Sequence, residues 1–243
     1  MGSESGSIKG GSTNQNITTS ETKAGYPIGG YWLISTAGYF NSQEEVDAYA
    51  KDGKKIQPAA EPGDIKFVDA NNDGVINDDD RVFQGSPFPD FTFALNGNMR
   101  YKNFDLSIGL QGVLGNKIYN ATRQTLEDVT KGSNFLASCL DYWTPENTDA
   151  EFPRVLAGFD YNHYGASSMD FSVQKASFLR LSALTLAYTF PTKVINALKL
   201  TNLRVYATGS NLFCLTNYNG YDPETGDWYP PTRMYTFGLN LAF

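Results

Sequence analysis

One segment, 69–80, carries oxygen-bearing side chains at the spacing of an EF-hand calcium loop. In such a loop, oxygen ligands stand at positions 1, 3, 5 and 12, a glycine stands at position 6, and position 7 offers its backbone carbonyl. The candidate ligands are Asp69, Asn71, Asp73, Val75, Asn77 and Asp80, with Gly74 at the turn. Hard oxygen ligands suit Ca²⁺, so the segment predicts a calcium site. Its flanks do not resemble two EF-hand helices, and an Asp- and Asn-rich turn loop without an ion is the alternative.

Aromatic side chains gather in the segments that we expect to form the longest loops. Their ring faces could stack on sugar rings or pack on a protein partner, whereas packing within the loops is the alternative. The candidates for contact with a substrate or partner are Trp143, Tyr161, Tyr221 and Trp228.

The sequence offers little for catalysis. Its one histidine, His163, has no Ser or Cys nucleophile motif beside it. No two carboxylates stand at a helix or strand spacing that would make an acid–base couple. Cys139 and Cys214 form neither a disulfide framework nor a metal cluster. These observations indicate that the chain is not an enzyme.

Five segments alternate apolar and polar side chains with a period of two. They are 91–101, 103–115, 178–190, 201–213 and 232–243. Each has about the 9–11 residues that a tilted strand needs to cross a bilayer, whereas strands of soluble proteins stop nearer five or six. The pattern therefore predicts an all-β fold of antiparallel, membrane-spanning strands. A soluble β-sandwich, whose strands also alternate, is the alternative.

The connections between these segments fall into two classes by length. Those at 101–103 and 191–200 are short, and those at 116–177 and 214–231 are long. Outer-membrane barrels have short periplasmic turns and long extracellular loops. If Phe243 is periplasmic, every short connection falls on the periplasmic side.

This assignment predicts two regions. Residues 1–90 form an extracellular loop region that contains the EF-hand-like loop, and 91–243 supply the C-terminal barrel strands with their long loops. Within the first region, Ser42 is expected to cap a short helix over 42–50.

Composition and length set further limits. A net charge of −7 argues against a nucleic-acid partner. No segment approaches the roughly 18 consecutive apolar residues of a transmembrane helix. Residues 1–25 lack the apolar core of a signal peptide. Five strands cannot close a barrel, because the smallest membrane barrels have about eight. We therefore expect the chain to be part of a longer barrel protein.

From about Gly25 to Phe243, the chain resembles the C-terminal part of the SusC/RagA family of TonB-linked outer-membrane proteins. The motifs that carry this resemblance are Gly-Tyr-Pro-Ile-Gly at 25–29, Pro-Gly-Asp-Ile-Lys-Phe at 62–67, Asp-Ala-Asn-Asn-Asp-Gly at 69–74, Phe-Asp-Leu-Ser at 104–107, Gln-Gly at 111–112, Trp-Thr-Pro-Glu-Asn at 143–147, Phe-Leu-Arg-Leu at 178–181, Leu-Arg-Val-Tyr at 203–206, Asn-Leu-Phe at 211–213 and Gly-Tyr-Asp-Pro-Glu at 220–224.

The resemblance implies the last strands of a plugged barrel of about 22 strands, set in the lipid of the bacterial outer membrane. It also implies uptake of glycan or peptide fragments, with a SusD-like surface lipoprotein as a lid. Energy would come from TonB, through an N-terminal part that this sequence lacks. Gly238, Leu241 and Phe243 match the signal that the barrel-assembly machinery reads. A soluble Ca²⁺-dependent carbohydrate-binding module is the alternative function, and dependence on detergent would separate the two.

Overall fold

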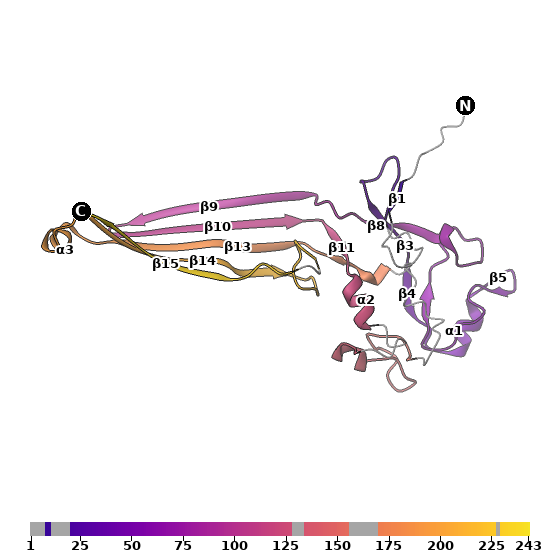
Figure 1. Cartoon of the computed structure of the whole chain (residues 1–243). Coiled ribbons are helices and arrows are strands. Elements are labelled where there is room, and N and C mark those ends of the chain that lie inside the picture. The colour runs from indigo at the N-terminus through magenta and orange to yellow at the C-terminus, as the bar shows by residue number, and fades with distance from the viewer. Residues whose placement is uncertain (1–7, 11–19, 128–133, 156–169, 227–228) are drawn as a thin grey trace, which may run out of the picture. The chain divides into compact units, whose positions relative to one another are not determined.

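The computed structural model describes residues 8–10, 20–127, 134–155, 170–226 and 229–243 (Figure 1). The chain divides into two compact units. Unit 1 comprises Met1–Phe88 and Lys117–Gln174, and unit 2 comprises Pro89–Asn116 and Lys175–Phe243. The connection between the second and third long strands therefore belongs mostly to unit 1.

Unit 2 is an antiparallel sheet in the order β15-β14-β13-β10-β9, drawn as the long neighbouring arrows of Figure 1. Its strands are β9 (Phe91–Tyr101), β10 (Phe104–Leu114), β13 (Phe178–Thr189), β14 (Asn202–Thr216) and β15 (Met234–Ala242). Each predicted segment coincides with one of them, so the all-β fold of long antiparallel strands is confirmed. Within the part of the chain that the structure describes, β9 and β15 each leave one edge without a strand partner.

The strand register gathers the apolar side chains on one face of this sheet. Leu106 pairs with Met99 on one side and with Leu186 on the other. The same row continues through Ala207 to Phe237. Among the described residues of unit 2, no second layer covers this face, and Leu186 and Phe237 are 51% and 80% exposed. The opposite face carries the polar row of Asn98, Ser107, Thr185, Thr208 and Thr236.

Two irregularities interrupt the ladders near one end of the sheet. Between β10 and β13 the register shifts at Ser182, so that Leu181 and Leu184 both reach the apolar face. Between β13 and β14 it shifts again opposite Asn211, which has a φ of 53°. An extra residue in a strand reverses the alternation beyond it. The bulge at Ser182 therefore keeps Arg180 on the polar face, paired with Gln111.

The short connections of the sheet are built differently from each other. The turn between β9 and β10 is tight, with Lys102 in the left-handed region at a φ of 53°. The connection from β13 to β14 holds the short helix α3 (Thr192–Ala197). In the part of the chain that the structure describes, no helix is both long enough and apolar enough to span a membrane.

Unit 1 consists of short elements around a small apolar core. Its elements are β1 (Ile8–Gly10), β2 (Ser20–Thr22), β3 (Gly30–Ile34), β4 (Thr36–Tyr39), α1 (Gln43–Ala48), β5 (Ala50–Lys51), β6 (Lys54–Lys55), β7 (Ile65–Phe67), η1 (Asp78–Asp80), β8 (Arg81–Gly85), β11 (Lys117–Tyr119), α2 (Ala121–Glu127), η3 (Ala137–Leu140), η4 (Asp170–Ser172) and β12 (Val173–Lys175), whose last residue passes into unit 2. The core cluster contains Ile34, Ile65, Phe67, Cys139 and Phe152. The predicted helix is confirmed, because the Ser42 side chain caps α1 by accepting from the Glu45 N–H.

Candidate functional site

The EF-hand-like loop lies between β7 and β8 and is shaped by its own carboxylates. Asp69 accepts the backbone N–H of Asp73 through Oδ1 at 3.0 Å and that of Gly74 through Oδ2 at 2.8 Å. Gly74 has a φ of 90°, which an L side chain rarely adopts. The glycine at the sixth position therefore makes the reversal that folds the loop around Asp69.

Asp80, the twelfth residue of the loop, has no exposed surface. Its Oδ1 accepts the Ala70 N–H at 2.8 Å, and its Oδ2 accepts the Asn77 N–H at 2.8 Å. Asn77 in turn caps η1, because its side-chain Oδ1 accepts the Asp79 N–H. The buried carboxylate thus joins the start of the loop to its end, and it does so through hydrogen bonds within the protein.

Asn71 and Asp73, at positions 3 and 5 of the loop, are exposed, and Asn77 is half-buried. Asp73 Oδ1 accepts the Val75 N–H at 2.8 Å, and this bond, with the Asn71 side chain, holds the pKa of Asp73 below its usual range. The Lys51 ammonium donates to the Asn72 carbonyl. Among the described residues, no group of three or more His, Cys, Asp or Glu side chains has the geometry to hold a metal. A calcium site would therefore need the Asn and backbone oxygens as well.

The predicted aromatic contacts differ in exposure. Trp143 is 7% exposed, and its Nε1 donates to Asn41 Oδ1 at 3.1 Å. Its ring also lies against Gly63, where an added Cβ would stand 2.4 Å from Cε3. Tyr221 is 68% exposed. Tyr161, Trp228 and His163 lie outside the described residues. Of the two candidates that the structure describes, only Tyr221 offers a free ring face.

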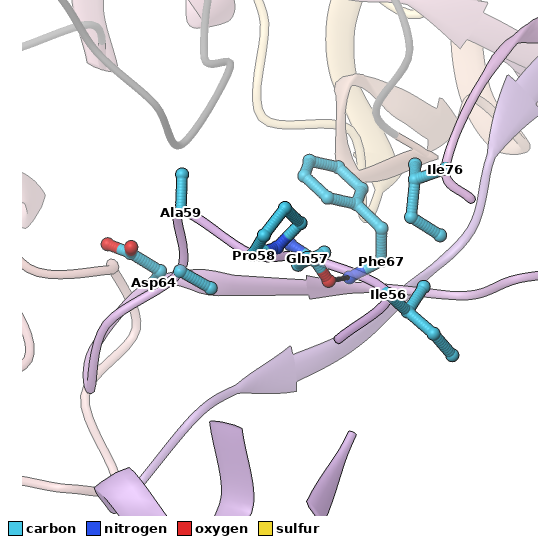
Figure 2. A pocket seen from close by; sticks show the side chains of 8 residues that line it. Ile56, Gln57, Pro58, Ala59, Asp64, Phe67 and Ile76 are labelled. Carbon is cyan, nitrogen blue, oxygen red and sulfur yellow. Dashed lines mark hydrogen bonds between the residues drawn. The ribbon is translucent and has the colours of Figure 1, made fainter. Parts of the chain in front are cut away.

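One small pocket of unit 1, with a volume of about 180 Å³, lies beside β7. The Gln57 side chain lines it and accepts from the Phe67 N–H (Figure 2). It also donates to the Ile65 carbonyl, so that it bonds to both ends of β7. Asp64, at the other end of the pocket, is held by Arg154. The polar groups of the lining are engaged within the protein, so the pocket offers no reactive group.

The polar face of the sheet carries two charge clusters. In one, Arg100 Nε and Arg204 Nη2 lie 3.3 and 3.6 Å from the two oxygens of Asp105. In the other, Arg180 is 3% exposed and its Nη2 lies 2.6 Å from Asp222 Oδ2. Sequence reasoning missed the partner Asp222, which lies 42 residues from Arg180 in the chain. An arginine within the apolar strand motif Phe-Leu-Arg-Leu was the available signal that it needed a counter-ion.

The residues that match an assembly signal lie on β15 and at the chain end. Gly238 pairs with Tyr206 of β14, and Leu241 pairs with Leu203. An added Cβ at Gly238 would stand 2.0 Å from the Tyr206 ring carbon Cζ. Phe243 is 92% exposed. The glycine therefore has a packing reason of its own, since it leaves room for the tyrosine ring across the strand.

Comparison with known proteins identifies long relatives of this chain. TonB-dependent receptor P26 of Formosa agariphila is 34% identical over 227 residues, which are 86% of this chain and 22% of the relative. TonB-dependent receptor P3 of the same organism is 32% identical over 76% of this chain. TonB-dependent receptor SusC of Bacteroides thetaiotaomicron is 29% identical over 96% of this chain and 21% of its own length. No family model matches the sequence.

The fold also matches solved structures. A chain in the structure of the RagAB peptide transporter superposes with a TM-score of 0.72 over 94% of this chain, at 22% sequence identity. The match covers 24% of that chain. The RagAB peptide importer in its closed-closed state gives a TM-score of 0.69. This chain thus spans about a fifth to a quarter of the length of the proteins it matches.

Proposed function

This chain belongs to the TonB-dependent receptor family, in its SusC/RagA-like branch, and from that premise we propose that it forms wall strands and loops of a nutrient importer. TonB-dependent receptors of this kind are outer-membrane proteins of Gram-negative bacteria, and the relatives are receptors and transporters, not enzymes. The nutrient is a glycan or peptide fragment, which is the cargo range that SusC/RagA resemblance implies.

The exposed apolar face of unit 2 is the observation that carries this proposal. At about 3.3 Å per residue and a tilt near 40°, the 11 residues of β9 rise roughly 28 Å, close to the thickness of a bilayer's hydrocarbon core. Lipid tails would cover Leu186 and Phe237, and the polar row would face the lumen. The unpaired edges of β9 and β15 would pair with the remaining strands of the barrel, since hydrocarbon does not tolerate open edges.

Opposite faces of β15 give a matched test in the receptor that contains this chain. Phe237→Arg puts a charge on the proposed lipid face and should cost about 2–4 kcal/mol near the bilayer midplane. Thr236→Arg places the same charge on the polar face, beside Thr208, and should cost less than about 1 kcal/mol. The measurement is the fraction of receptor that migrates as folded, heat-modifiable barrel on gels of outer-membrane extracts. Equal losses in both variants, or a chain that stays folded and monomeric in plain buffer, would contradict a membrane wall.

The partners follow from the same proposal. A SusD-like surface lipoprotein would close the extracellular mouth, TonB would supply energy through a separate N-terminal part, and the barrel-assembly machinery would insert the strands. This chain is similar to the RagAB peptide importer, which has been solved in open-open and closed-closed states. That similarity supports a two-component importer of this kind. Copurification of a lipoprotein with the tagged receptor is the expected result. Purification of the receptor alone under mild detergent would argue against the lipoprotein partner. Uptake that is unchanged when TonB is deleted would argue against TonB.

We further propose that loop 69–80 binds Ca²⁺. Support comes from the ligand spacing, from the reversal at Gly74, and from the exposed Asp73 carboxylate at position 5 of the loop. Asp69 and Asp80 each accept backbone N–H groups, but a carboxylate has about four lone-pair positions and can bind an ion as well. The extracellular side can supply Ca²⁺ at the millimolar level that weak sites need.

Calorimetry on the intact receptor tests the calcium proposal. Asp69→Ala removes the ligand at position 1 and should abolish Ca²⁺ binding. Asp79→Ala removes the same charge from the same segment at a position that EF-hand spacing does not use, so binding should remain within about threefold. Unchanged binding in Asp69→Ala, or equal losses in both variants, would favour a turn loop without an ion.

A further inference from the structure

Within unit 2, the connection from β14 to β15 folds onto the polar face of the sheet. Two of its residues make the contact: Asp222 is buried, and Glu224 is half-exposed. Glu224 Oε2 accepts from Gln111 Nε2 at 3.4 Å, which brings the connection across to β10. The stretch 217–226 therefore contacts the polar side of β10 and β13.

Arg180 is the charge beneath this stretch. It projects from β13, and its buried guanidinium lies 2.6 Å from Asp222 Oδ2 and 3.5 Å from Glu224 Oε2. Its guanidinium carbon also lies 5.1 Å from the ring centre of Phe178. Among the described residues, both carboxylates that pair with Arg180 come from the connection. A buried guanidinium without its counter-ions would be strongly unfavourable, so the strand and the connection depend on each other.

Asp222 also organises the connection internally. Its Oδ1 accepts the backbone N–H groups of Glu224 at 2.9 Å and Thr225 at 3.2 Å, and its carbonyl accepts that of Gly226 at 2.8 Å. One carboxylate thus holds a turn with one oxygen and the strand arginine with the other. The ring of Tyr218 lies over Gly220, where an added Cβ would stand 2.2 Å from Cε1.

We propose that the buried Arg180–Asp222 pair pins stretch 217–226 to the lumen-facing side of the sheet, so that it forms a fixed part of the channel wall. The assignment of that side to the lumen rests on the proposed function. Arg180 is a positioning residue: it holds in place a turn that presents the exposed ring of Tyr221. A connection that served as a moving gate would have to break a buried ion pair at each opening, which the geometry disfavours.

Hydrogen exchange of the intact receptor in detergent, read by mass spectrometry on peptides covering 217–226, tests the pinning. Arg180→Gln is the decisive variant, because Arg180 makes none of the turn's backbone hydrogen bonds. The amides of 224–226 should exchange at least tenfold faster than in the wild type, while peptides from β9 keep their rates. Asp222→Asn should act in the same direction.

Arg204→Gln is the matched control, since it removes an arginine from the same polar face in the Asp105 cluster. Exchange in 217–226 should stay within twofold in that variant. Slow exchange that persists in Arg180→Gln would overturn the pinning, as would fast exchange of the wild-type stretch. Exchange is measured whether or not the receptor transports a nutrient. A protein that folds without detergent would therefore contradict the proposed importer function and the assignment of the polar face to the lumen. The exchange measurement would still test the contact between Arg180 and stretch 217–226.

Discussion

Replacing Gly238 by alanine should destabilise the sheet, because the new methyl group would collide with a neighbouring ring. An ideal Cβ would stand 2.0 Å from Tyr206 Cζ and 2.2 Å from Cε1, whereas carbon atoms in contact lie about 3.5–4.0 Å apart. The two residues are directly paired in the β14–β15 ladder, so the backbone cannot move one without the other. The ring must therefore move by roughly 1.5 Å or more, and overpacking of this kind costs about 1–3 kcal/mol.

Chemical unfolding of the purified receptor in detergent micelles measures this cost as a shift of the transition midpoint. Gly97→Ala is the matched control, because an added Cβ there meets nothing within 4 Å, and its effect should stay within about 0.5 kcal/mol. Tyr206→Ala completes a double-mutant cycle. In that background the ring is gone, so Gly238→Ala should lose most of its effect and reveal the coupling between the two positions.

The cycle also separates packing from recognition by the assembly machinery. If Gly238 mattered only as part of an assembly signal, Gly238→Ala would lower the amount of receptor inserted in cells and leave the unfolding midpoint unchanged. Tyr206→Ala would then give no relief. A midpoint shift below about 0.5 kcal/mol in Gly238→Ala, or the same shift with and without Tyr206, would refute the steric argument.

Two further predictions concern unit 1. Arg154→Met leaves the buried Asp64 carboxylate without the guanidinium that now contacts both of its oxygens, and it should destabilise the unit by about 3–5 kcal/mol. The measurement is limited proteolysis, in which residues 1–88 should be cleaved faster than in the wild type. Resistance to proteolysis equal to that of the wild type would contradict this prediction. Burial, assisted by the Glu151 carboxylate, raises the pKa of Tyr39 from 10.0 to about 12, so the neutral phenol contributes stability that is present below about pH 10 and is lost as pH rises through about 12. Tyr39→Phe should lack this alkaline loss in an unfolding series between pH 9 and 12, and an unchanged pH profile would count against it.

The long strands could be predicted from the sequence because alternation depends only on neighbouring residues. The register could not be predicted fully, since the bulge at Ser182 changes the phase of β13 and only pairing with β10 reveals it. In the sequence, Phe178-Leu179-Arg180-Leu181 and the alternation after Ala183 look like one strand without interruption. A single inserted residue therefore decides that Arg180 faces the polar side.

The candidate sites were predicted unevenly for a similar reason. Spacing alone finds the oxygen-bearing residues of 69–80, but it does not tell that Asp80 is buried and bonded to Ala70 and Asn77. Ion pairs across long separations leave no local pattern at all, as with Arg180 and Asp222. Trp143 shows the same limit, since a tryptophan in a long loop looks available until Asn41 and Gly63 are found against its ring.

The two units bury apolar surface in different ways. This difference distinguishes a membrane wall from a β-sandwich, whereas the alternation of apolar and polar residues is the same in both. Unit 1 buries Phe40, Leu33 and Val46 almost completely, which removes their apolar surface from water. The strands of unit 2 instead direct Leu95, Leu186 and Leu239 away from the protein, with more than half of each side chain exposed. A sandwich would need a second sheet against that face. The hydrocarbon of a bilayer is the solvent that fits an exposed apolar face of this kind.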